Sequence, residues 1–203
     1  MKRTRNRASI AAYTAVEVLM AMAVLAVGVI GIIASEKVTV SSNLHAKNLA
    51  IASHIGQAWL GVLEAESSVW TSSAAISNTT WISQGAGETD WFRPSYDGTL
   101  LFGPAFDALG NPVRNEDLDA LAGNGAKFCV DLRFSELNTS IGGTGMYRVE
   151  VRVVWLREQG IVAGAVTAPT NACGIAAARV AGDDEQRLFY FLFLSGAVRQ
   201  VVP

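Results

Sequence analysis

The chain has 203 residues, of which 50% are hydrophobic and 17% charged, with a formal net charge of −2. It is too apolar for an ordinary soluble domain, although it is long enough to form one domain with its own core. No basic patch occurs outside the first few residues, which argues against a nucleic-acid partner. The excess of apolar residues lies at the N-terminus, where a membrane segment is therefore expected.

A basic leader precedes a long uncharged run. Between Glu17 and the next charged residue lie 18 residues, Val18 to Ser35. As a helix rising about 1.5 Å per residue, this run is roughly 27 Å long, close to the thickness of a bilayer core. The positive leader predicts a cytoplasmic N-terminus and export of everything after Ile33. The leader's four charges are Lys2, Arg3, Arg5 and Arg7.

The apolar segment can be interpreted as a cleaved secretory signal or as a plain signal anchor, and neither interpretation explains the whole segment. A cleaved secretory signal has a shorter apolar region, and here the run from Ala12 to Ile33 passes without a break into a polar helical pattern. A plain signal anchor explains everything except Glu17, because a lone carboxylate near the start of a membrane helix is costly unless it has a partner. Glu17 is therefore a candidate functional residue.

The helical pattern continues beyond the membrane run. From Val40 to Val62, apolar residues recur at spacings of three, four and seven with polar residues between them, as in an amphipathic helix. We expect one helix from about Thr14 to Ala65, apolar on all sides in its first half and on one side in its second. Gly56 and Gly61 weaken a helix, and we expect them to allow close packing or a small bend.

The helical pattern stops between Val69 and Ala126. Scattered tryptophans and repeated Gly, Pro and Asn turn signals predict a long connection with short strands at most, around Thr99–Phe102. Its aromatic residues predict that it packs as a lobe on the helix or the sheet.

From Lys127 the hydrophobic period becomes two. Phe128–Phe134 alternates, and Tyr147–Trp155 is the clearest strand, with its odd-numbered apolar residues on one face. The other face carries charged residues and is expected to meet water, so that the sheet is covered on one side only. These charged residues are Arg148, Glu150 and Arg152.

The C-terminal residues predict a hairpin. Leu188–Leu194 is an apolar strand, Ser195-Gly196 a turn, and Ala197–Val202 a last strand. The expected fold class is therefore α+β, with a long N-terminal helix packed on a C-terminal antiparallel sheet of about four strands.

The two cysteines, Cys129 and Cys173, both lie in the part expected to be exported. An even pair in an oxidising compartment predicts a disulfide, closing a loop of about 45 residues that is worth roughly 4 kcal/mol. The alternative is two free buried thiols. Neither cysteine has a second Cys or His at ligand spacing, so no metal site is expected there. A calcium site at Asp183-Asp184-Glu185 would need more oxygen ligands, and a solvated loop is the simpler interpretation.

No motif of enzyme chemistry occurs. The sequence has no phosphate loop, dinucleotide fingerprint, zinc signature or G-x-S-x-G elbow. The only histidines, His45 and His54, both fall on the long helix, so a histidine-activated nucleophile in the globular part is not expected. We therefore expect no catalytic residue, no cofactor and no metal.

The N-terminal residues resemble type IV prepilins and type II secretion pseudopilins. The family pattern is Gly followed by Phe-Thr-Leu-Ile-Glu, and here Ala12 is followed by Tyr13-Thr14-Ala15-Val16-Glu17. The apolar run that follows, with Gly28 and Gly31, looks most like PilV-like minor pilins. The motif resemblance covers about the first quarter of the chain. It implies a pilin-like fold with a leader at 1–12, a helix at 13–66 whose part 13–35 spans the membrane and later the filament core, and a globular exported domain at 67–203.

The resemblance also implies roles for single residues. Prepilin peptidase would cut after Ala12 and methylate the new Tyr13 amine, although Ala stands where the family has Gly, and a cut after Ala11 stays open. Glu17 of one subunit would meet the terminal amine of its neighbour in the filament. Gly28 and Gly31 would let the helix stretch as it leaves the membrane.

The implied function is that of a minor pilin that primes pilus assembly and joins a tip complex for motility or adhesion. Its partners would be other minor and major pilins, prepilin peptidase, the inner-membrane assembly platform and a tip adhesin. It would sit in the bacterial inner membrane before assembly and in the pilus filament or tip afterwards. Two alternatives stay open: a minor pseudopilin of a type II secretion system, and a plain membrane-anchored binding or enzyme domain in which Glu17 is incidental.

Overall fold

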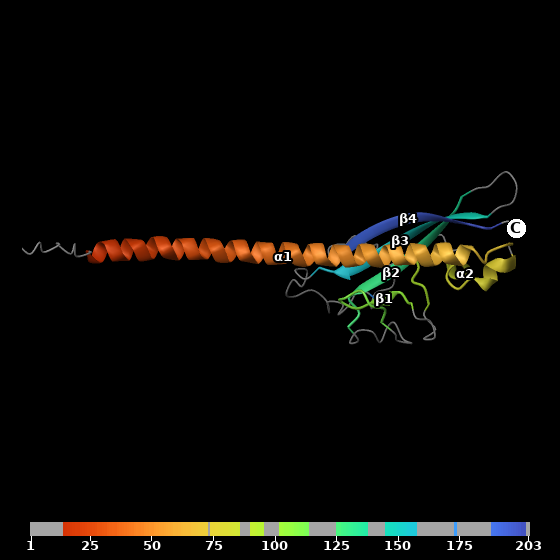
Figure 1. Cartoon of the computed structure of the whole chain (residues 1–203), viewed down its shortest axis with the longest axis horizontal. Coiled ribbons are helices and arrows are strands. Elements are labelled where there is room, and N and C mark those ends of the chain that lie inside the picture. The colour runs from red at the N-terminus through yellow and green to blue at the C-terminus, as the bar shows by residue number, and fades with distance from the viewer. Residues whose placement is uncertain are drawn as a thin grey trace, which may run out of the picture. The chain divides into compact units, whose positions relative to one another are not determined.

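The structure is a computed structural model that describes residues 14–72, 74–85, 90–95, 102–113, 125–137, 145–157, 173 and 188–201. These residues form a long helix, α1, two short helical segments and a four-stranded antiparallel sheet (Figure 1). The predicted α+β fold class is confirmed. The chain forms two compact units, Met1–Ala46 and Lys47–Pro203.

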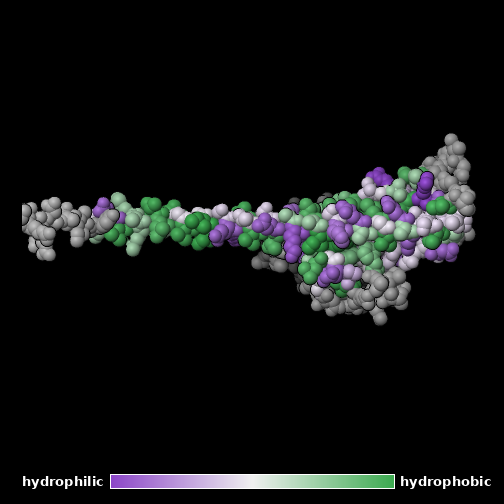
Figure 2. Space-filling model, viewed as in Figure 1, coloured by the Kyte–Doolittle hydropathy of each residue, from purple (hydrophilic) through white to green (hydrophobic). Residues whose placement is uncertain are grey.

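Helix α1 runs over Ala15–Ser67, within two residues of its predicted ends. No proline occurs in this stretch, and Ala, Leu and Met favour the helix. Every residue from Val16 to Ile33 is exposed, and Figure 2 shows mainly hydrophobic side chains along the visible face of this part. By length and composition, α1 is the one helix among the described residues that is apolar enough to cross a membrane.

The second half of α1 presents one face to a core. Ile55 and Trp59 are buried as predicted, whereas Val40 and Leu44 are exposed. A Cβ added to Gly56 would lie 2.4 Å from Leu194 Cδ1, so Gly56 allows close packing. The packing role predicted for Gly61 is wrong, because nothing lies within 4 Å of its Cβ position. The buried face of α1 consists of Asn48, Ala52, Ile55, Gly56, Trp59 and Leu63.

The segment after α1 packs on this helix through an aromatic residue, as predicted. It forms the 3₁₀ helix η1 over Ala74–Asn78 and the short helix α2 over Ile82–Gly85. The ring of Trp81 meets that of Trp59 edge-on, with 5.1 Å between centroids. The expected strand near Thr99–Phe102 lies largely outside the described residues. Phe102 itself is not in a strand, and the local strand is β1, Ala105–Phe106.

The sheet has the order β1-β2-β3-β4, with all neighbours antiparallel. Strand β2 spans Phe128–Glu136, β3 spans Met146–Leu156 and β4 spans Phe189–Arg199. The predicted C-terminal hairpin is wrong, because β4 continues unbroken through Gly196, which pairs with Val149. A Cβ at Gly196 would lie 3.0 Å from Leu60 Cδ2, so this glycine makes room for α1 rather than a turn.

The face of the sheet opposite α1 is covered in part, which corrects the prediction of a solvated charged face at Arg152 but leaves Arg148 exposed. The main core lies between α1 and the face that carries Val149, Val151 and Val153. On the opposite face, Asp131 is 0% exposed and Arg152 is 2% exposed. The period-two pattern identified the two faces, but it could not show that chain from outside the sheet returns to cover the second one.

Candidate functional site

Thr14 and Glu17 form a capping box at the start of α1. The Glu17 backbone N–H donates to Thr14 Oγ1 at 3.3 Å, and the Thr14 backbone N–H donates to Glu17 Oε2 at 3.3 Å. The Thr14 hydroxyl lies 3.4 Å from the same carboxylate oxygen. These bonds satisfy backbone donors that the first turn of a helix leaves unpaired. Glu17 therefore has a local role in the single chain.

The surface that follows Glu17 is apolar and uncovered. Glu17 is the only charged residue between Thr14 and Ser35. Its carboxylate also lies in the first turn of α1, where the helix dipole favours a negative charge. An exposed apolar helix of this length requires lipid or other helices around it. The arrangement thus provides an exposed apolar surface with one negative charge at its beginning.

The structure does not test the roles predicted for the other residues of this region. Gly28 and Gly31 lie within α1, and nothing lies within 4 Å of a Cβ added to either one. Their predicted role in helix stretching stays a prediction. Ala12 and Tyr13, the expected cleavage and methylation site, lie outside the described residues.

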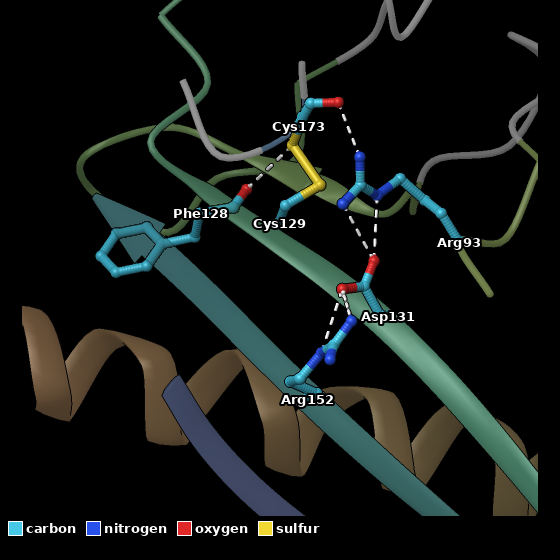
Figure 3. Close-up of polar contacts among 6 residues, drawn as sticks. All are labelled: Arg93, Phe128, Cys129, Asp131, Arg152 and Cys173. Carbon is cyan, nitrogen blue, oxygen red and sulfur yellow. Dashed lines mark hydrogen bonds and ion pairs between the residues drawn. A yellow bond between two sulfur atoms is a disulfide. The ribbon is translucent and has the colours of Figure 1, made fainter. Parts of the chain in front are cut away.

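The predicted disulfide is present in the second unit. Cys129 on β2 is bonded to Cys173, with 5.3 Å between their Cα atoms (Figure 3). Both side chains are buried, in a cluster that includes Ala105, Val154 and Phe189. The bridge therefore attaches Cys173 to the face of the sheet that lies opposite α1.

A buried ionic cluster lies beside this disulfide. Arg152 on β3 donates from Nε and Nη2 to Asp131 Oδ2, at 3.2 and 2.7 Å. Arg93 donates from Nε to Asp131 Oδ1 at 3.1 Å, and its Nη1 donates to the Cys173 carbonyl oxygen at 2.6 Å. Figure 3 shows the Asp131 carboxylate between the two guanidinium groups. The cluster joins strands β2 and β3 to the 90–95 segment and to Cys173.

Segment 90–95 reaches this position by pairing with the sheet. Phe92 and Leu132 exchange two backbone hydrogen bonds, of 2.9 and 2.8 Å. This pairing places Arg93 beside Asp131. It also places the Trp91 ring beneath the guanidinium of Arg152, whose Cζ lies 4.4 Å from the ring centroid.

Sequence analysis missed several of these residues for identifiable reasons. The Thr14-x-x-Glu17 spacing is itself a capping-box signature and was sufficient to predict the local bonds. Asp131 carried a weaker signal as a lone acid within an alternating strand. Nothing local pairs Arg93 with a residue 38 positions later. His45 and His54 are both exposed on α1.

The described residues contain no group of three His, Cys, Asp or Glu side chains that could hold a metal ion. Asp183, Asp184 and Glu185 lie outside the described residues. No family of known proteins, no curated protein and no solved structure matches this chain. The candidate functional site is therefore defined by its residues alone: the Thr14–Glu17 cap and the exposed apolar face of α1.

Proposed function

We propose that this chain is a minor pilin of a type IV pilus, an assembly subunit rather than an enzyme. One observation carries the proposal: a basic leader is followed by an exposed apolar helical stretch, 14–35, in which Glu17 is the only charged residue. The order of small residue, aromatic, Thr and Glu in Ala12–Glu17 supports it. So does the separation of the chain into an N-terminal helical unit and a second unit that contains the sheet.

The mechanism rests on the pairing of two charges. Cleavage after Ala12 creates a cationic amine on Tyr13, which prepilin peptidase then methylates. In a stack of apolar helices, this amine meets Glu17 of the neighbouring subunit. Apolar burial supplies most of the attraction, and the ion pair sets the register, because one member left alone costs roughly 3–5 kcal/mol.

The capping box allows a sharp test of this mechanism. Glu17→Gln keeps a side chain that can accept the Thr14 N–H bond, but it removes the charge. Thr14→Ala keeps the charge and removes the threonine hydroxyl. We expect Glu17→Gln to lower incorporation into sheared surface filaments by at least about tenfold, given the cost of an unpaired buried charge. Thr14→Ala should incorporate nearly as the wild type does.

The opposite pattern would contradict ion pairing. If Glu17→Gln assembles normally and Thr14→Ala fails, Glu17 acts through the cap and not through its charge. Mass spectrometry of the mature N-terminus provides the parallel check, and a methylated Tyr13 is the expected result. Neighbouring genes for a secretion apparatus would favour the pseudopilus over the pilus.

A plain membrane-anchored binding domain is the second candidate. The observation that favours it is the capping box itself, since the bonds to Thr14 give Glu17 a role without any partner subunit. This candidate predicts that the chain remains uncut, with Met1 and the basic leader still attached. It also predicts that Glu17→Gln is harmless.

A further inference from the structure

A pocket lies on the face of the sheet opposite α1, separate from the proposed assembly surface. It has a volume of about 290 Å³. Residues from β2, β3, β4 and segment 90–95 line it, and all of them belong to the second unit. The residues that matter for recognition are Trp91, Arg133, Arg148, Glu150, Phe193 and Ser195.

The pocket carries an excess of positive charge. Glu150 accepts from Arg133 through one carboxylate oxygen and from Arg148 through the other, the latter at 3.0 Å. One carboxylate thus serves two guanidinium groups. The Arg148 side chain is 54% exposed, and among the described residues only its Nη2 meets a carboxylate. Its remaining N–H groups can bind a planar, doubly accepting group such as a carboxylate.

A buried group of paired charges adjoins the pocket through Arg152, whose guanidinium lies over the Trp91 ring. Asp131 is also shared between two arginines, Arg93 and Arg152. The lining of the pocket itself places two arginines, Arg133 and Arg148, against one carboxylate, Glu150. A site with this charge balance favours an anion over a neutral molecule and disfavours a cation.

Aromatic rings form the apolar side of the pocket. Phe193 on β4 is 60% exposed. Its ring is stacked with Phe191, with 6.1 Å between centroids, and meets Trp91 edge-on at 5.7 Å. Phe193 thus contacts two other rings, and its exposed part presents a flat apolar surface to a ligand.

We propose that this pocket binds an acidic saccharide, a sugar ring that bears a carboxylate. The carboxylate would accept from the exposed Arg148, and the apolar C–H face of the sugar would stack on Phe193. Ring hydroxyls would meet Glu150 and Ser195. Few polar groups converging beside an apolar wall are typical of small-molecule sites, and the volume suits a ligand of one or two sugar rings.

The test uses the full chain in a sugar-free zwitterionic detergent, with Trp fluorescence and ligand-observed NMR as readouts. Glucuronate, glucose and acetate are titrated separately. Glucuronate should saturate the site in the millimolar range. Glucose lacks the carboxylate and acetate lacks the sugar ring, so we expect the affinity of each to be at least about tenfold lower. If acetate binds as tightly as glucuronate, the pocket is a simple anion site and the saccharide proposal is wrong. If glucuronate does not bind at a concentration about 50 times the expected dissociation constant, the proposal is overturned outright.

Two variants assign binding to the pocket. Arg148→Gln removes the exposed guanidinium and leaves the Arg133–Glu150 pair, and it should weaken glucuronate at least about tenfold. Lys47→Gln removes the same charge from an exposed position on α1 and should bind as the wild type does. Equal effects of the two variants would mean that net charge, and not this pocket, holds the ligand.

Discussion

At the residue scale, the most constrained side chain is Asp131. It is 0% exposed and lies between Arg93 and Arg152, with four nitrogen contacts of 2.7 to 3.2 Å. Taking such charges out of water is costly, and the cluster persists only because each carboxylate oxygen is paired. Its contribution is better described as positioning segment 90–95 on the sheet than as a large net gain in stability.

Removing the charge of Asp131 should therefore be severe. Asp131→Asn removes the buried carboxylate charge that Arg93 and Arg152 share, and we expect a loss of about 3–5 kcal/mol in the free energy of unfolding. Glu150→Gln breaks a more exposed pair and should cost less than about 1 kcal/mol. Denaturant unfolding of the full chain in detergent measures both. Similar losses for the two variants would contradict the distinction by burial.

Tyr147 makes stability depend on alkaline pH. Burial raises the pKa of Tyr147 above its ordinary value, and the nearby Glu136 carboxylate raises it further. In the unfolded chain the Tyr147 hydroxyl loses its proton near pH 10, whereas in the folded chain it does so at a higher pH. The contribution of Tyr147 to the free energy of unfolding is therefore fully present below about pH 10 and is lost as the pH rises toward the pKa of the folded state. The ring is stacked on Trp70, with 5.5 Å between centroids.

Tyr147→Phe isolates this effect, because it keeps the stacked ring and removes the titrating hydroxyl. We expect wild type to lose more stability than Tyr147→Phe between pH 8 and pH 11, while groups common to both chains cancel in the comparison. Unfolding midpoints at the two pH values measure the difference. Parallel losses in the two chains would show that Tyr147 is not responsible.

At the element scale, α1 serves two environments with one continuous helix. Its first half is exposed on all sides and apolar, and its second half buries a stripe that includes Ala52, Ile55 and Trp59. Two glycines in the second half of α1 differ in their surroundings. Gly56 lies against β4, whereas Gly61 faces open space. A glycine thus marks close packing only where another element is within reach of a Cβ.

This difference predicts opposite results for one substitution. Gly61→Ala should stabilise the protein by about 0.5–1 kcal/mol, since alanine favours the helix and meets nothing. Gly56→Ala gains the same propensity but must displace Leu194 and approach Val153, and we expect a net loss of about 1–3 kcal/mol from overpacking. Thermal unfolding of the two single variants makes the comparison. A stabilised Gly56→Ala would indicate that Leu194 moves aside at no cost.

At the scale of the whole molecule, a disulfide and an ionic cluster lie side by side on the sheet face opposite α1 and attach distant parts of the chain to it. The Cys129–Cys173 bridge joins residues 44 apart, and Arg93 donates to the Cys173 carbonyl oxygen beside it. Constraining the unfolded chain over a loop of this length contributes about 4 kcal/mol on the loop-entropy model. The bridge thus offsets part of the cost of ordering chain far from its contacts in sequence.

Replacing both cysteines by alanine should lower the free energy of unfolding by about 4 kcal/mol. Reduced wild-type protein should behave in the same way, which separates loss of the bridge from loss of the sulfur atoms. Chemical unfolding of oxidised, reduced and double-alanine protein under one set of conditions provides the measurement. A loss below about 1 kcal/mol would show that the unfolded chain is already restricted without the bridge.

The sequence alone determined whatever depends on local pattern. The uncharged run after Glu17, the helical period of α1 and the alternation in β3 each report which sides of one element meet water or apolar surroundings. The cysteine pair could also be predicted, because only two cysteines occur in the chain. The Thr14–Glu17 cap belongs to the same class, since its spacing is local.

Only the tertiary structure decided which elements meet. Gly196 looked like a turn residue, yet it pairs with Val149 within β4, and its missing side chain leaves room for Leu60 of α1. The charged face of β3 looked solvated, yet Arg152 is buried because Arg93, Trp91 and Cys173 come from distant parts of the chain. Burial is a property of the assembled surfaces, and a single strand records its two faces without recording what will cover them.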